Sequence, residues 1–183
     1  MKLNLHVLAS VGLALLLSGA VLNFTTILAQ DGQLFPPVME YMKEGSAFFL
    51  KNDFKSAIGP YNRALELEKK QAVLSKTLWY VLVDNLGMSY GITGDLKKAK
   101  ETFEYGLSKD DKYPLFYYNL ACTYAEMNDL ENTIVQLKRA FEYRQHILPG
   151  ESMPDPANDD SFQRFMQNKR FLAALKELKA AGK

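Results

Sequence analysis

The sequence predicts an all-α protein built as a solenoid of three helix hairpins that ends in C-terminal capping helices. Apolar residues recur at three- and four-residue steps after residue 37, as one buried face of a helix requires. The same pattern of residue types also returns after 34 residues in the later part of the chain. With 48% hydrophobic and 23% charged residues, the 183-residue chain has the composition of one globular domain.

Three segments share this pattern, and each carries a small residue in its first helix and an aromatic residue three positions later. In the second helix of each segment, a small residue is followed four positions later by a bulky one. Gly87 and Ala121 are 34 residues apart, whereas Gly45 and Gly87 are 42 apart. We attribute the longer first spacing to about two additional helical turns over residues 71–79. The matching positions are Gly45, Gly87 and Ala121; Phe48, Tyr90 and Tyr124; Ala57, Ala99 and Thr133; and Tyr61, Phe103 and Leu137.

The small residues predict that the two helices of each unit approach closely. We expect the aromatic side chains of Phe48, Tyr90 and Tyr124 to fill the space that the small residues leave. Between the two helices of each unit, Asn or Gly is followed by Asp, which suits a tight turn in which the Asp caps the next helix. These pairs are Asn52-Asp53, Gly94-Asp95 and Asn128-Asp129.

These motifs resemble the tetratricopeptide-repeat (TPR) family, whose units place an aromatic residue, Leu-Gly, Tyr, Ala and Phe at fixed offsets. The resemblance covers residues 38–145 and implies a right-handed α-solenoid with units at about residues 38–71, 80–113 and 114–147. Glu44, Thr133 and Leu137 depart from the family pattern, so the third unit is the loosest of the three.

The C-terminal part predicts a cap for this solenoid. Prolines indicate a loop over residues 146–160, and helical spacing of apolar residues indicates capping helices over residues 161–183. Asp159, Asp160 and Ser161 are candidates for the helix N-cap. The segment from Asp159 to Phe165, with the Lys-Arg-Phe-Leu-Ala-Ala-Leu that follows, resembles the ending of many bacterial TPR proteins.

Residues 1–29 have the pattern of an export signal. Lys2 precedes an apolar stretch from Val7 to Leu22, and the next charged residue is Asp31. We expect cleavage after Ala20 or after Ala29. Residues 7–28 are also long enough to form an uncleaved membrane anchor, so both interpretations stay open. Either one predicts an exported protein, in the bacterial periplasm, secreted or held in the inner membrane, with residues 30–37 as a linker.

The sequence offers no catalytic constellation, so we expect no enzyme, no cofactor and no metal site. Lys and Arg number 22 and Asp and Glu number 21, a balance that argues against nucleic-acid binding. Cys122 is the single cysteine and is expected to act as a small hydrophobic residue. His146 has too few neighbouring ligands for a metal, and the acidic residues between 155 and 160 lack the Gly and Glu of a calcium loop.

The resemblance also implies which side chains face the inner groove, because the first helix of each TPR pair lines it. In chaperone-binding TPR proteins a Lys/Asn/Arg clamp holds a terminal carboxylate. Here only Asn85 matches this clamp, since Met42, Leu115 and Asn119 stand at the positions of its basic residues. The groove is therefore expected to be apolar and rich in Met, and to take a helix or an extended apolar segment. The candidate binding residues are Met42, Ser46, Phe49, Asp84, Asn85, Met88, Tyr118, Asn119 and Cys122.

These observations favour a protein–protein interaction module, a scaffold of the cell envelope whose partners are other proteins. Two alternatives stay open. In the first, the groove side chains pack against neighbouring units and bind no partner. In the second, the chain associates with itself through this face, as a self-assembling or membrane-tethered structural spacer.

Overall fold

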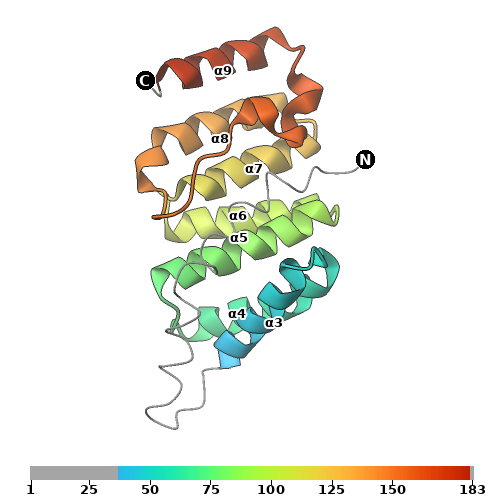
Figure 1. Ribbon diagram of the computed structural model, residues 1–183, viewed down its shortest axis with the longest axis vertical. Helices are drawn as coiled ribbons and strands as arrows, with labels where there is room; N and C mark the ends of the chain where they lie inside the picture. Colours follow the sequence, from blue (N-terminus) through green and yellow to red (C-terminus); the bar gives the residue numbers. More distant parts are fainter. Residues whose placement is uncertain (1–36, 182–183) are drawn as a thin grey trace.

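The computed structural model describes residues 37–181, and within this range all regular structure is helical (Figure 1). The predicted all-α fold is confirmed. The α-helices are α3 (Pro37–Phe49), α4 (Phe54–Lys70), α5 (Lys76–Ile92), α6 (Leu96–Lys109), α7 (Pro114–Glu126), α8 (Leu130–Glu142) and α9 (Lys169–Ala181). Three short 3₁₀ helices separate α8 from α9: η1 (Arg144–His146), η2 (Pro156–Asn158) and η3 (Asp160–Phe165).

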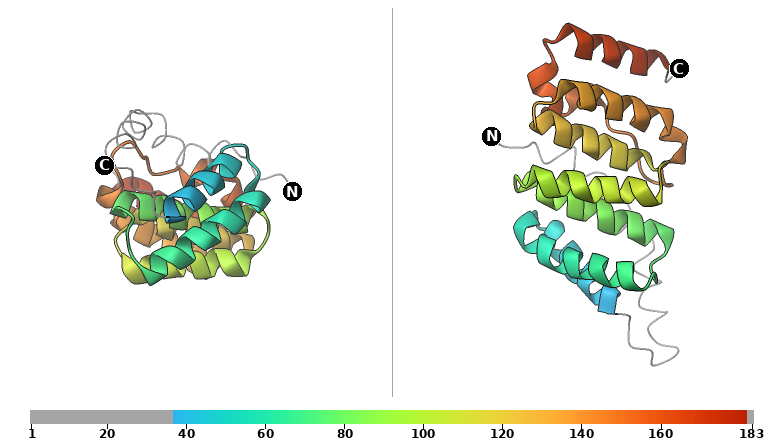
Figure 2. Two further views of the ribbon diagram at one scale, coloured as in Figure 1. Left: turned by 90° about the horizontal axis from the view of Figure 1, so that it is seen from below. Right: turned by 180° about the vertical axis from the view of Figure 1, so that it is seen from behind.

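The helices form three hairpins, α3–α4, α5–α6 and α7–α8, stacked along the long axis of the molecule (Figures 1 and 2). Helix α5 contacts both α3 and α7, so these three helices form one inner layer. We call the side of this layer that faces away from α4, α6 and α8 the groove face. The buried apolar residues form two clusters along the stack, one over α3 to α7 and one over α7, α8, η3 and α9, as expected for units that cannot bury their apolar faces alone.

The turn inside each hairpin depends on one residue in the left-handed region of backbone space. Asn52, Gly94 and Asn128 have φ angles of 60°, 90° and 61°. Asn and Gly tolerate this conformation better than other residues do. The next residue in each case is an Asp whose carboxylate accepts a backbone N–H of the following helix, as predicted. The pairs are Asp53 with Ser56 N at 3.1 Å, Asp95 with Lys98 N at 3.2 Å and Asp129 with Asn132 N at 3.1 Å.

Glycine notches set the distance between the two helices of a hairpin. A Cβ atom on Gly87 would lie 2.5 Å from ring atoms of Phe103, and one on Gly45 would lie 2.7 Å from the ring of Tyr61. The predicted close approach is therefore present, but the predicted filling residues were wrong. The rings over these notches come from the second helix of the same unit, because its four-residue step places them opposite the glycine.

The additional helical turns predicted over residues 71–79 are also only partly present. Helix α4 ends at Lys70 and α5 begins at Lys76, so residues 71–75 are a loop. The buried carboxylate of Glu68 accepts the backbone N–H groups of Val73 (3.0 Å) and Leu74 (3.2 Å). The Glu68 side chain therefore supplies the hydrogen-bond acceptor that these two backbone N–H groups would have found within a longer helix.

The C-terminal part continues the stack as an irregular fourth pair. The segment η3 packs against α7, and α9 packs against α8 (Figure 1). Phe162 and Phe171 are fully buried in this junction. Part of the region expected as capping helices is thus 3₁₀ helix, with Asp159 accepting the backbone N–H of Ser161 at 3.0 Å.

The predictions made for residues 1–36, which include the export signal or anchor and most of the linker, lie outside the described residues. Among residues 37–181, no helix combines the length and hydrophobicity that crossing a bilayer requires.

Candidate functional site

The nine residues predicted to line the groove all lie on the inner-layer helices α3, α5 and α7. Eight of them are buried, and Ser46 is half-buried. The polar members of the set are hydrogen-bonded to other parts of the chain. Three such links connect successive units, and we take them in order along the stack.

The first link joins unit one to unit two through a buried tyrosine. The side-chain amide of Asn85 donates to the Tyr61 hydroxyl at 3.0 Å, and this hydroxyl donates to Ser46 Oγ at 3.1 Å. Burial raises the pKa of Tyr61 to about 12, so the phenol stays protonated and can donate. Asn85 thus fixes the position of α5 against the α3–α4 hairpin.

The second link joins unit two to unit three through a buried carboxyl group. The side-chain amide of Asn119 donates to Asp84 Oδ1 at 2.7 Å. Burial raises the pKa of Asp84 to about 7; the Asn119 hydrogen bond acts against this rise and the negative charge of Glu151 adds to it. Glu151 lies far along the chain, in the predicted C-terminal loop, so its influence shows that this loop reaches the groove.

The third link joins unit three to the C-terminal segment. Asp159 is 3% exposed and accepts the Tyr118 hydroxyl at 3.0 Å and the Cys122 thiol at 3.8 Å. Burial raises the pKa of the Cys122 thiol well above its ordinary value, which keeps the sulfur protonated and unreactive. Cys122 therefore contributes packing and a weak donor, as the sequence predicted.

The C-terminal segment follows α7 from one end to the other. At the start of α7, the Tyr113 hydroxyl donates to Glu151 at 3.0 Å, and at the end Arg164 Nη2 donates to Glu126 Oε2 at 2.7 Å. The Asp159 contacts lie between these two. Figure 1 shows the same course, with the chain between η1 and η3 crossing in front of α7 on the groove face.

Tyr113, which contacts this segment, is itself stacked on another aromatic ring. Its ring lies 3.9 Å from the ring of Tyr80, centroid to centroid, and the two rings are nearly parallel. The Tyr80 hydroxyl in turn donates to Asp110 Oδ2 at 2.5 Å, which fixes the Tyr80 ring. Burial raises the pKa of Tyr113 and of Glu151. No sequence pattern indicated Tyr113 and Glu151 as groove residues, since neither occupies a TPR groove position.

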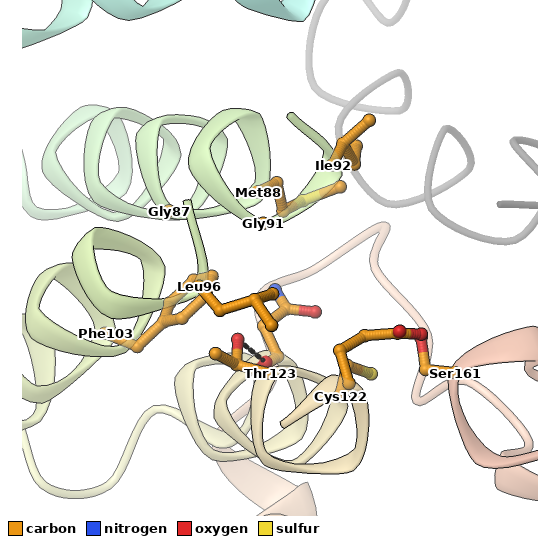
Figure 3. Close-up of a pocket in the computed structure, with 11 residues that line it drawn as sticks. Gly87, Met88, Gly91, Ile92, Leu96, Phe103, Cys122, Thr123 and Ser161 are labelled. Carbon is orange, nitrogen blue, oxygen red and sulfur yellow. Dashed lines mark hydrogen bonds between the residues drawn. The ribbon is translucent and has the colours of Figure 1, made fainter. Parts of the chain in front are cut away.

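An open, mostly apolar hollow remains beyond this covered part, where α5, α6 and α7 meet (Figure 3). Figure 3 shows Met88 and Ile92 of α5 on one side and Cys122 and Thr123 of α7 on the other, with Ser161 closing one end. Met88, Asn119 and Cys122 are the members of the predicted set that line it. The complete lining is Gly87, Met88, Gly91, Ile92, Leu96, Phe103, Asn119, Cys122, Thr123, Glu126 and Ser161.

Comparison with known proteins identifies the repeated unit. The sequence profile of the tetratricopeptide repeat matches residues 83–108 and 115–146, which are the second and third hairpins. The second and third hairpins are therefore tetratricopeptide repeats. No curated protein sequence matches it significantly.

Several solved structures of other proteins share the fold. The MamA protein is 22% identical over 60% of this TPR chain, with a TM-score of 0.50, and the chain spans only 55% of the MamA structure. The Sgt2 TPR domain from Aspergillus fumigatus is 21% identical over 79% of this chain and 78% of its own, with a TM-score of 0.53. The translocator chaperone SycD of Yersinia enterocolitica is 16% identical over 80% of this chain and 94% of its own, with a TM-score of 0.52.

The chemistry of this TPR groove is apolar and hydrogen-bonding. Among the described residues, no three His, Cys, Asp or Glu side chains lie close enough to hold a metal ion. The groove amides of Asn85 and Asn119 already donate to partners within the chain. The groove therefore divides into a part covered by the C-terminal segment and an open part, the hollow between α5 and α7.

Proposed function

We propose that this chain is a non-catalytic protein–protein interaction module of the cell envelope, which binds a peptide or helix of a partner in its groove. The observation that carries the proposal is the open hollow between α5 and α7, because it is lined mainly by apolar side chains of α5, α6 and α7. TPR repeats are protein-interaction units, and one similar structure is that of a secretion translocator chaperone, which supports a protein as the partner.

The lining of the hollow indicates the chemistry of the partner. Met88 is flexible and polarisable and can adapt to different apolar side chains. No Lys or Arg lines the hollow, so it offers no ion pair to a terminal carboxylate. An apolar side chain presented by a helix or an extended segment is the ligand that fits best, with the rest of the partner lying along the groove face.

The experiment that tests this function uses a photo-reactive amino acid at one of two positions. Ile92 borders the hollow, and Val135, which is 51% exposed on α8, serves as the matched control away from it. After irradiation of living cells, we expect a partner to be cross-linked from position 92 and not from position 135. The variant Ile92→Asp should lower recovery of that partner at least about tenfold, because an unpaired charge is costly to bury. Equal capture from both positions would refute the groove as the binding site.

An envelope location is the second part of the proposal, and it rests on the basic start and the long apolar stretch of residues 1–29. Cell fractionation followed by N-terminal sequencing of the mature chain tests it. We expect the protein in the envelope fractions, beginning after residue 20 or 29 if the signal is cleaved and at Met1 if it serves as an anchor. A chain that begins at Met1 in the soluble cytoplasmic fraction would contradict export.

Light scattering of the purified mature protein tests whether it acts alone. A module that holds its partner in the groove is expected to be monomeric. A stable oligomer whose contacts include the hollow would instead support the alternative of a self-assembling spacer.

A further inference from the structure

Residues 147–154 cover the groove face more loosely than the chain that follows them, and we call them the strap. Ile147, Leu148 and Met153 are half-buried against the core of α5 and α7, whereas Pro149, Gly150 and Ser152 are exposed. A side-chain hydrogen bond from Tyr113 to Glu151 joins the strap to the N-cap residue of α7. By contrast, Ser161 and Phe162 beyond the strap are almost fully buried.

The strap is a local turn that holds its own shape. The backbone N–H of Glu151 donates to the Leu148 carbonyl at 3.0 Å, and the backbone N–H of Leu148 donates to the Glu151 carboxylate at 3.2 Å. Gly150, with a φ of 89°, allows this turn. Because these hydrogen bonds lie within the strap, the strap can leave the groove without breaking any bond of the helices.

The strap lies over a different part of the groove face from the open hollow. Glu151 lies near enough to Asp84 to act on it electrostatically, and Asp84 and Asn119 form the floor between α5 and α7. The strap thus places three apolar side chains and one carboxylate over the groove. Its contacts show what chemistry this part of the groove accepts: an extended segment with apolar side chains on either side of an acceptor for the Tyr113 hydroxyl.

We propose that the strap is a built-in occupant of the groove, and that a partner replaces it with an extended segment of the same chemistry, apolar residues flanking an acidic one. This inference rests on the proposed function, because it describes how a partner reaches the groove. A partner segment that extends from the hollow along the groove face to Tyr113 must displace the strap, so its apparent affinity is reduced in proportion as the fraction of molecules with an open strap becomes smaller.

The test uses a fluorescent synthetic peptide with the sequence of residues 145–156, added to the full chain. Its binding is measured by fluorescence anisotropy. The chain with Leu148→Ser, Glu151→Ala and Met153→Ser has a weakened strap and should bind the peptide at least about tenfold more tightly than the natural chain. The matched control is Ser152→Ala, an exposed strap residue, which should leave the affinity unchanged.

A second experiment tests the hydrogen bond between the Tyr113 hydroxyl and the acceptor on the peptide. In the weakened-strap chain, Tyr113→Phe keeps the ring on Tyr80 but removes the hydroxyl, and it should lower peptide affinity about tenfold. The single variant Glu151→Gln replaces the charged acceptor of the Tyr113 hydroxyl by a neutral one. Because a hydrogen bond to a neutral acceptor is weaker, this variant loosens the strap with little disturbance of the fold and should bind the peptide more tightly than the natural chain does. Thermal melts monitor folding of each variant.

The two proposals fail in different ways. If neither Glu151→Gln nor the triple variant binds the peptide more tightly than the natural chain does, the strap is a permanent part of the fold and this inference is overturned. The proposed function would survive that result if position 92 still captured its partner. Loss of that capture, with the peptide still binding, would leave the strap as an occupant and remove the hollow as the partner site.

Discussion

At the scale of single residues, the spacing of the second hairpin depends on the missing side chain of Gly87. A Cβ there would lie 2.5 Å from the buried ring of Phe103, which cannot turn away because it is 1% exposed. We therefore expect Gly87→Ala to lower the free energy of unfolding by about 1–3 kcal/mol through overpacking. Gly91→Ala is the control, since a Cβ there would meet Ala99 at an ordinary 3.7 Å. Urea denaturation of both variants measures the difference in their free energies of unfolding. Equal values would show that the missing side chain of Gly87 does not set the spacing of the two helices.

Asp84 makes stability depend on pH in a direction opposite to that of most carboxylates. Its pKa rises from 3.8 to about 7 on folding, mainly because it is buried. The folded chain therefore holds a proton that the unfolded chain has lost, and stability falls as pH rises from about 4 to about 7, by at most about 1.4 kcal/mol per pH unit.

Asp84→Asn tests this pH dependence because its amide oxygen can still accept the Asn119 hydrogen bond. We expect this variant to flatten the stability profile between pH 4 and 7 and to be more stable than the natural chain above pH 7. Chemical denaturation across this pH range is the measurement. A profile that falls with the same slope in both proteins would exclude Asp84 as the cause.

The sequence predicted single residues well where a local pattern determines them. The Asp caps and the glycine notches follow from spacing along one helix or one turn, and they are present. The contacts of Glu151 with Tyr113 and of Asp159 with Tyr118 span 38 and 41 residues and follow no period, so no sequence pattern could indicate them. The groove residues thus lie on the predicted helices, but what covers them could not be predicted.

At the scale of elements, the loop of residues 71–75 shows a local side-chain contact with the backbone where the repeat interval predicted helix. The sequence predicted helix there from the longer repeat interval, whereas Glu68 holds the loop by accepting two backbone N–H groups. Glu68→Ala would leave these groups without their acceptor, and we expect a loss of about 1–3 kcal/mol in the free energy of unfolding. Glu66→Ala, an exposed change on the same helix, should have little effect. Thermal unfolding distinguishes the two, and an equal effect would show that the loop does not need Glu68.

At the scale of the whole molecule, the C-terminal pair η3 and α9 closes the apolar end of the stack. Removing residues 160–183 would expose the surface of α7 and α8 that Phe162, Phe165 and Phe171 cover. Open solenoid ends are poorly soluble without a cap, so we expect this truncated chain to aggregate and to lose a sharp thermal transition. Arg170→Ala removes only an exposed ion pair with Glu131 and should change stability by less than about 1 kcal/mol. Light scattering and circular dichroism follow both proteins, and a monomeric, cooperatively unfolding truncation would contradict the capping role.

The central claim is that one groove on the inner layer is shared by the chain's own strap and by a partner. Hydrogen exchange with mass spectrometry, performed on the full chain with and without the partner captured through position 92, tests it most directly. We expect the partner to slow exchange in the second half of α5 and of α7, to speed exchange in residues 147–154, and to leave residues 155–165 unchanged. Protection confined to α4, α6 or α8, with the strap unaffected, would contradict the claim.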